Sequence, residues 1–283
     1  MFNRQGLYVV WLLLTASSPG FGFTNNIMVT GYWPPTNEML RQFSTNSTQN
    51  PSGWRGGNWE NRGYNIHSFF PEYPKGSFPV GEGDFEVDYQ DTSKDWARIS
   101  NEIKPMAIIT FSRGSGALDW ELEWRQRNLQ VWVNDYIAPF QPTPSPPDST
   151  APPGFIRFSS LPMQGIVDAV NGAGLGLNGF IDNTGFGGGF LSEFIAYHGT
   201  WYHDEHADPK DPYRNFASGH IHVGTEVSVP QGIAASEVSL RVLTDYLDAM
   251  VPEPSTLLAA LGGLTFLVLR RYGRSRKRKT ADP

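Results

Sequence analysis

A hydroxyl group at the start of a predicted helix is the first candidate for chemistry in this chain. Ser192 follows a glycine-rich turn at residues 185–189, and apolar residues then repeat at helical spacing from Phe190 to Trp201. Amides in a first helical turn have no intrahelical partner and lie at the positive end of the helix dipole, so they favour a developing anion. Ser192 is therefore a candidate nucleophile. The alternative is that Ser192 only caps the helix, which is a common role for serine.

A histidine in a distant strand could act as the base that such a serine requires. His222 lies in the apolar run at residues 219–223, GHIHV, and His220 lies two residues away on the same face of the predicted strand. Histidine is the side chain most often used to move protons near neutral pH. A structural role for either ring is the alternative.

One group of residues has the composition of a metal site. His203 and His206 stand three residues apart and could share a helix face, with acidic residues close by in the sequence. The segment then reaches Asp208-Pro209, a turn signal, and it offers no defined third ligand. A solvated helix end is the default interpretation, and His203 and His206 are kept as a weak metal candidate.

Several other kinds of site are excluded by the local sequence. Phe190 and Phe194 flank Ser192 where a G-x-S-x-G elbow would have glycines, and Phe190 also replaces the last glycine of G-x-G-x-x-G. No P-loop lysine follows the glycines. The chain contains no cysteine, which excludes disulfides, thiolate metal sites and a cysteine nucleophile. No cofactor is predicted.

The elements that must position these residues alternate between strands and helices. Strand-like runs are expected at residues 26–31, 106–111, 177–181 and 219–223, and helices at 93–103, 162–172, 190–202 and 236–250. A proline-rich stretch at 138–154 is expected to form a stiff loop. This alternation predicts an α/β layered architecture, and residues 24–250 show no internal domain boundary.

The two ends of the chain read as targeting segments. Residues 1–23 contain Arg4, an apolar run and then small residues, which is a secretory signal pattern. Residues 270–283 hold seven basic residues and one acidic residue, a net charge of +6, so that the rest of the chain carries −12. An acidic body argues against nucleic acid as a partner.

The C-terminal segment, residues 251–283, resembles a PEP-CTERM sorting signal. Pro252-Glu253-Pro254 precedes a short apolar stretch at residues 256–269 and then the basic cluster. The apolar stretch predicts a short transmembrane segment, and the basic end predicts that the body lies outside the cytoplasm. The resemblance implies export, processing by an exosortase and a first anchorage in the inner membrane. The expected location is the periplasm, the outer envelope or the extracellular matrix. An ordinary tail anchor is the alternative.

The body resembles pyroglutamyl peptidase I, or pyrrolidone-carboxylate peptidase, in six short motifs that occur in the family's order. They are residues 28–32 (MVTGY), 50–52 (NPS), 123–128 (EWRQRN), 160–162 (SLP), 187–193 (GGGFLSE) and 219–223 (GHIHV). The resemblance implies a single three-layer α/β/α domain with a mixed, mostly parallel sheet.

The resemblance also implies functional residues. Ser192 stands at the position of the family's nucleophilic cysteine, His222 at that of its histidine and Glu123 at that of its functional glutamate. A serine must lose its proton to His222 during attack, with Glu123 orienting His222 or binding substrate. The expected oxyanion and substrate contacts are Gly188, Gly189, Tyr32 and Asn128, together with the amide of Ser192.

The sequence departs from the family at two places, and these departures leave two hypotheses open. Glu193 replaces an asparagine, and Pro35 and Thr36 replace a Phe-Gly pair whose aromatic ring helps to hold the pyroglutamyl group. The first hypothesis is an exported serine-type hydrolase that acts on a peptide or small amide through Ser192, His222 and Glu123. The second is a catalytically inactive binding domain on the same fold, which recognises an envelope or matrix ligand.

Overall fold

The computed structural model describes residues 24–251. The predicted signal peptide and nearly all of the predicted sorting signal lie outside the described residues. Within them, no helix combines the length and the apolar character that a membrane crossing requires.

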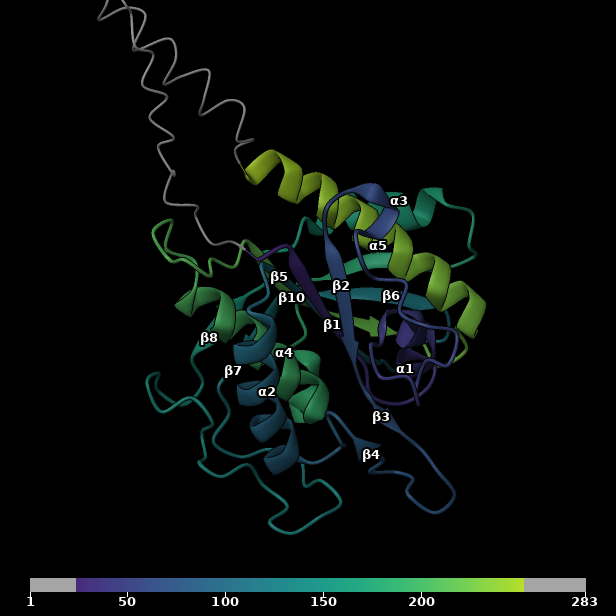
Figure 1. The fold of residues 1–283 in the computed structure, drawn as a ribbon. Helices are drawn as coiled ribbons and strands as arrows, with labels where there is room; N and C mark the ends of the chain where they lie inside the picture. Colours follow the sequence, from purple (N-terminus) through teal and green to yellow (C-terminus); the bar gives the residue numbers. More distant parts are fainter. Residues whose placement is uncertain (1–23, 252–283) are drawn as a thin grey trace, which may run out of the picture.

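A six-stranded sheet forms the centre of the molecule, in the order β2-β1-β5-β10-β6-β9 (Figure 1). Strands β2, β1, β5 and β10 run parallel, whereas β6 is antiparallel to β10 and β9 is parallel to β6. The sheet is therefore mixed and mostly parallel, as predicted. The strands are β1 (Asn26–Thr30), β2 (Asn65–Phe69), β5 (Ala107–Arg113), β6 (Asp119–Glu123), β9 (Asn178–Asp182) and β10 (Ala217–Val223).

Helices cover both faces of this sheet and complete three layers (Figure 1). Helices α1, α3 and α5 pack on one face, and α2 and α4 pack on the other. Buried strands that are apolar on both sides are expected of a parallel sheet covered in this way. The helices are α1 (Thr36–Leu40), α2 (Tyr89–Ile103), α3 (Met163–Gly172), α4 (Leu191–Glu205) and α5 (Val229–Met250).

Two small antiparallel pairs lie outside the main sheet. Strands β3 (Pro71–Glu72) and β4 (Glu82–Gly83) form a hairpin, and β7 (Arg125–Arg127) pairs with β8 (Ile156–Phe158). The β7–β8 pair joins the chain after β6 to the end of the proline-rich loop, residues 138–154. It therefore ties that long connection to α4, because Arg127 of β7 pairs with Glu193 and Arg157 of β8 bonds to Tyr197 and Asp204.

All eight predicted strands and helices occur, whereas β2, β6, α1 and the two small strand pairs were not predicted. Two differences are instructive. Helix α5 begins at Val229 rather than Ser236, because Ser228 and Gln231 form a capping box and Pro230 occupies the first turn. Strand β6 was not predicted, because three of its five residues, DWELE, are acidic, and acidic residues are depleted in strands. Their alternation with apolar residues buries Trp120 and Leu122 in the core on one face and presents glutamates on the other.

Candidate active site

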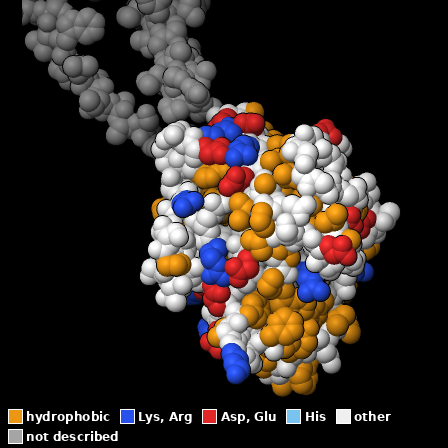
Figure 2. Space-filling view, turned by 90° about the vertical axis from the view of Figure 1, so that its right-hand side faces the viewer, with side chains coloured by type: hydrophobic (Ala, Val, Ile, Leu, Met, Phe, Trp, Pro, Cys, Tyr) orange, Lys and Arg blue, Asp and Glu red, His pale blue; other side chains and the backbone are white. Residues whose placement is uncertain are grey.

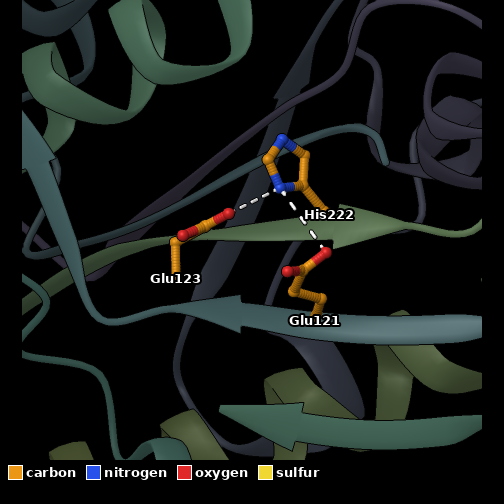
Figure 3. A group of neighbouring side chains, drawn as sticks. All are labelled: Glu121, Glu123 and His222. Carbon is orange, nitrogen blue, oxygen red and sulfur yellow. Dashed lines mark hydrogen bonds and ion pairs between the residues drawn. The ribbon is translucent and has the colours of Figure 1, made fainter. Parts of the chain in front are cut away.

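Polar side chains gather on the sheet face that α4 covers. Strand residues two apart point to the same face, so His220 and His222 of β10 point the same way, as do Glu121 and Glu123 of β6. The antiparallel register pairs His220 with Glu123 and His222 with Glu121. Figure 3 shows both glutamates rising from β6 toward His222. The topology thus brings together two stretches about a hundred residues apart in the chain.

His222 and Glu123 form a buried hydrogen-bonded pair. The Nδ1 atom of His222 lies 2.8 Å from Oε1 of Glu123 and 3.9 Å from Oε2 of Glu121 (Figure 3). His222 is 7% exposed and Glu123 is 2% exposed. An ionised carboxylate can only accept hydrogen bonds, so Nδ1 of His222 carries the hydrogen and donates a hydrogen bond to Glu123. In the neutral ring Nε2 is then left with a lone pair, which is the state that a general base requires.

The neighbouring His220 has no comparable freedom. Its Nδ1 lies 2.8 Å from Oγ1 of Thr110 and its Nε2 lies 2.9 Å from Oγ of Ser112. Complete burial holds the pKa of His220 well below its usual range, and the nearby His222 lowers it further. His220 is therefore a neutral core residue that supports the strand beneath His222.

Ser192 lies in the first turn of α4, where the sequence places it. The residue at the N-cap is Phe190, and no side chain caps the helix, so Ser192 does not have the capping role. The preceding turn contains Gly187, Gly188 and Gly189 with φ angles of +70°, +88° and +73°. These left-handed conformations favour glycine, which explains the run of three at this bend.

Ser192, His222 and Glu123 line one cavity of about 500 Å³. Its wall combines both glutamates of β6, the glycine turn and the charged ends of strands. The β5–β6 turn can pass beside His222 only because residue 114 is glycine; a Cβ atom there would lie 2.9 Å from Cβ of His222. The other lining residues are Arg113, Gly114, Ser115, Glu121, Arg127, Asp182, Gly185, Phe186, Gly187 and Gly188.

Glu193, next to Ser192, has a structural partner on each oxygen. Its Oε1 accepts from the amide and Nε of Arg127 at 3.0 and 2.8 Å, and its Oε2 accepts from the Gly189 amide at 2.7 Å. Burial raises the pKa of Glu193, while the Arg127 guanidinium opposes that rise. The Gly189 amide, expected to be an oxyanion donor, is thus occupied by Glu193. Gly188 remains on the cavity wall.

Tyr32 and Asn128, the two expected substrate contacts, lie in different surroundings. Tyr32 is buried, bonds through its hydroxyl to Thr92 at 3.0 Å, and lines a small cavity of about 20 Å³ that Ser192 also lines. Asn128 is fully buried, and its Nδ2 donates to the carbonyl of Asp148 at 2.8 Å. Asn128 therefore holds the proline-rich loop and does not line the cavity with Ser192, since its amide group is committed to backbone partners.

The two histidines proposed as a weak metal site are separated by their own partners. Nδ1 of His203 lies 3.0 Å from Oδ1 of Asn215, and Nδ1 of His206 lies 2.8 Å from Oδ2 of Asp211. Among residues 24–251, the one group of three or more potential metal ligands is Glu121, Glu123 and His222. Glu121 was missed in the sequence. The available signal was its spacing of two residues from Glu123 in an alternating acidic and apolar run.

An exposed aromatic surface adjoins Ser192. Figure 2 shows hydrophobic side chains gathered at the lower end of the molecule, the end at which the β3–β4 hairpin lies in Figure 1. Phe78 of that hairpin is 64% exposed. The ring of Trp33 lies 6.1 Å from Phe78, 6.2 Å from Tyr136 and 6.4 Å from Phe190. Because Phe190 also lines the small cavity beside Ser192, the aromatic surface leads to the site.

Comparison with known proteins identifies the fold. No family model and no curated protein matches the sequence. Among solved structures, the pyrrolidone carboxyl peptidase of Thermococcus litoralis matches with a TM-score of 0.57 and 16% identity, over 81% of this chain and 97% of that one. The pyrrolidone carboxyl peptidase of Pyrococcus furiosus, described with its cysteine-free mutant, matches with a TM-score of 0.56 and 18% identity, over 78% and 99%. The chain therefore has the pyrrolidone carboxyl peptidase fold.

Proposed function

We propose that this protein is a hydrolase of the pyroglutamyl-peptidase type that cleaves an amide bond with Ser192, His222 and Glu123. The observation that carries the proposal is the 2.8 Å contact between His222 and Glu123, which faces a cavity that Ser192 also lines. Serine, histidine and carboxylate act together as nucleophile, base and orienting group on many unrelated folds. The fold likeness and the sequence motifs support this assignment.

In the proposed reaction, Oγ of Ser192 attacks the amide carbon as Nε2 of His222 takes its proton. The imidazolium that forms then protonates the leaving amine, and water repeats the sequence on the acyl enzyme. Glu123 holds the Nδ1 proton in place and stabilises the imidazolium. Because Glu123 is almost fully buried, water screens this stabilisation only weakly.

The oxyanion would lie against the start of α4. Backbone amides in this first turn have no intrahelical partner, and the positive end of the helix dipole adds to their effect. The Gly188 segment and the amide of Ser192 are the donors that the geometry leaves for this role, since the Gly189 amide bonds to Glu193. One such donor contributes about 3–4 kcal/mol to the transition state.

The surroundings of Ser192 favour a substrate with an apolar group. Tyr32, Trp33 and Phe190 line the small cavity beside the serine, and the exposed aromatic surface continues from it. A peptide or small amide with an aromatic or aliphatic residue near the scissile bond would bury apolar area against the exposed aromatic surface, since the small cavity itself, at about 20 Å³, has room for only about one water molecule. Pro35 and Thr36 stand where the peptidase family carries Phe-Gly, so we do not restrict the substrate to pyroglutamyl peptides.

We further propose that the protein works outside the cytoplasm. The support is the signal pattern at residues 1–23 and the Pro-Glu-Pro, apolar and basic series after Val251. Exosortase-type processing would release the body from the inner membrane. Fractionation of cells that express the full chain tests this: the mature protein is expected outside the cytoplasm, and retention in the cytoplasm would contradict the proposal.

A fluorophosphonate probe tests the catalytic assignment directly. Labelling of the full-length protein is expected, with loss in Ser192→Ala and retention in Ser93→Ala, whose serine lies on α2 outside the cavity that Ser192 lines. Turnover of aminoacyl-coumarin amides should follow the same pattern. If neither labelling nor turnover occurs in the folded wild-type protein, the hydrolase is refuted and the inactive binding domain takes its place.

A further inference from the structure

We propose that Glu121, Glu123 and His222 form a binding site for a divalent metal ion of the zinc type. One potential ligand atom from each residue lies within 4.8 Å of the other two. Two carboxylates and an imidazole on rigid, adjacent strands form a donor set that Zn²⁺ accepts, and the cavity above them leaves a coordination position open. The site contains Glu121, which has no part in the proposed serine chemistry.

The spacing of the ligand atoms suits one small ion. Zinc lies about 2.0–2.2 Å from oxygen and nitrogen ligands, so tetrahedral ligands are about 3.4 Å apart. Nδ1 of His222 lies 2.8 Å from one glutamate and 3.9 Å from the other, which brackets that separation. All three ligand atoms lie within 4.8 Å of one another, so rotation of the three side chains could close the set around a metal ion without movement of β6 or β10.

The local charges also favour a dication. Oε2 of Glu123 is buried and accepts no hydrogen bond from the described residues. Within residues 24–251, Glu121 and Glu123 form no ion pair with an arginine or a lysine, and His222 is their shared partner. Arg127, which lines the same cavity, is paired with Glu193 instead. An unpartnered carboxylate oxygen at 2% exposure is costly, and a bound cation would satisfy it.

The mixed donor set selects the class of metal. Imidazole suits zinc, copper, iron and nickel, whereas magnesium and calcium prefer oxygen ligands alone. Zn²⁺ and Co²⁺ are therefore expected to bind much more tightly than Mg²⁺. Co²⁺ has the further use that its visible absorption reports the coordination directly.

Metal capture would switch off the base, a consequence that rests on the proposed function. The metal takes the lone pair of Nδ1, so the proton now on Nδ1 moves through solvent to Nε2 and no proton is lost overall. Nε2 then carries hydrogen and cannot accept the proton of Ser192. The same imidazole can hence serve either as the base of the hydrolase or as a metal ligand. Zinc would be a reversible inhibitor at the base itself.

Calorimetric titration of the metal-free full-length protein with Zn²⁺ tests the site. One equivalent is expected to bind to the wild type and to Ser192→Ala with the same affinity. Glu121→Gln should weaken binding at least about tenfold, and Glu121→Ala should do the same if the glutamine variant folds poorly. His203→Gln is the matched control, because His203 bonds to Asn215 away from the cavity, and it should bind as the wild type does.

The Co²⁺ spectrum adds a readout that is independent of activity. The wild type should give a visible absorption band of a four- or five-coordinate ion that Zn²⁺ displaces and that Glu121→Gln lacks. The site is refuted if the wild type binds no Zn²⁺ at about 100 μM free metal, far above the dissociation constants expected of a protein zinc site. It is also refuted if Glu121→Gln binds Zn²⁺ as tightly as the wild type.

Failure of the metal site and failure of the hydrolase give different results. Each variant is compared with and without added Zn²⁺. Both proposals are supported if Zn²⁺ abolishes probe labelling of the wild type, if a chelator restores that labelling, and if Zn²⁺ does not lower the labelling of Glu121→Gln. Zinc binding in a protein that never labels would leave the metal site standing and refute the hydrolase. Labelling that Zn²⁺ does not affect would refute the inhibitory capture of His222.

Discussion

Two cavities of nearly equal size lie toward opposite ends of helix α4, and they differ in how their histidines are held. The cavity at the N-terminal end has about 500 Å³ and is lined by Ser192, Glu123 and His222. The cavity along the C-terminal half has about 480 Å³ and lies between α2 and α4, with Trp96 and His198 in its wall. Both contain a histidine, so neither volume nor residue type separates them.

The surroundings of the two histidines do separate them. His198 is stacked between Trp96 at 5.6 Å and Trp201 at 5.7 Å, and its Nε2 has no hydrogen-bond partner among the described residues. Burial lowers the pKa of His198 to about 4. His222 instead donates to Glu123, which can stabilise its protonated form. A histidine becomes a base through a carboxylate that supports its charge, and apolar rings have the opposite effect.

The largest expected effect is the loss of activity on removal of His222, and removal of His198 is its control. His222→Gln should lower the rate of amide hydrolysis by roughly 10⁴–10⁶-fold, because the serine then has no base. His198→Gln should change the rate constant of the folded enzyme by less than about tenfold, since His198 lies away from the reacting groups. Steady-state kinetics on coumarin amides provides the measurement. Equal losses in both variants would mean that the comparison between the cavities is wrong.

Glu123→Gln is expected to have the next largest effect. The glutamine cannot stabilise an imidazolium and can hold the ring in the wrong tautomer, so the rate should fall by about 10³–10⁴-fold. Glu123→Asp should recover part of that loss if the carboxylate charge is what matters. A Glu123→Gln enzyme within tenfold of the wild type would show that Glu123 does not orient His222.

The acid sensitivity of the fold should depend on His198. With an unfolded pKa of about 6.5 and a folded pKa of about 4, the unfolded state binds more protons between these values. The free energy of unfolding therefore falls as the pH falls from 6.5 to 4, and the total loss from His198 is about 3 kcal/mol.

Urea unfolding at pH 7 and pH 4 measures this contribution. His198→Phe keeps a ring between the two tryptophans and should make the loss of stability about 3 kcal/mol smaller than in the wild type. Ser93 lines the same cavity, and Ser93→Ala should leave the loss of stability between pH 7 and pH 4 unchanged. An unchanged pH dependence in His198→Phe would show that His198 does not remain neutral in the folded protein.

The smallest effect is expected in the reactivity of a single introduced thiol. The chain contains no cysteine, so Ser192→Cys and Ser93→Cys each create one labelling site. Near a helix N-terminus and His222, a thiol should lose its proton more easily, so alkylation by iodoacetamide at pH 7 should be at least about tenfold faster at position 192. Equal alkylation rates at positions 192 and 93 would contradict the inference that the N-terminal end of α4 favours an anion.

Sequence patterns located most of the fold and part of the site. Apolar runs placed β1, β5 and β10, and helical periodicity placed α2, α3 and α4, because burial on a strand or helix face imposes those spacings. Ser192 was placed in the first turn of α4 by the glycines before it. Strand β2 was not predicted. Strand β6 was missed, and Glu121 with it, because acidic residues are depleted in strands and three of its five residues are acidic.

The sequence by itself determined which residue types could do chemistry and the local structure on which each lies. It could not decide which of them meet, because a strand pattern does not encode its neighbours or their register. Only the tertiary structure set β6 antiparallel to β10, so that Glu121 and Glu123 face His222, and only it tied His203 and His206 to separate partners. The physical reason is that the pairing of distant strands arises from burial across the whole sheet, whereas each local motif reports only its own neighbours in the chain.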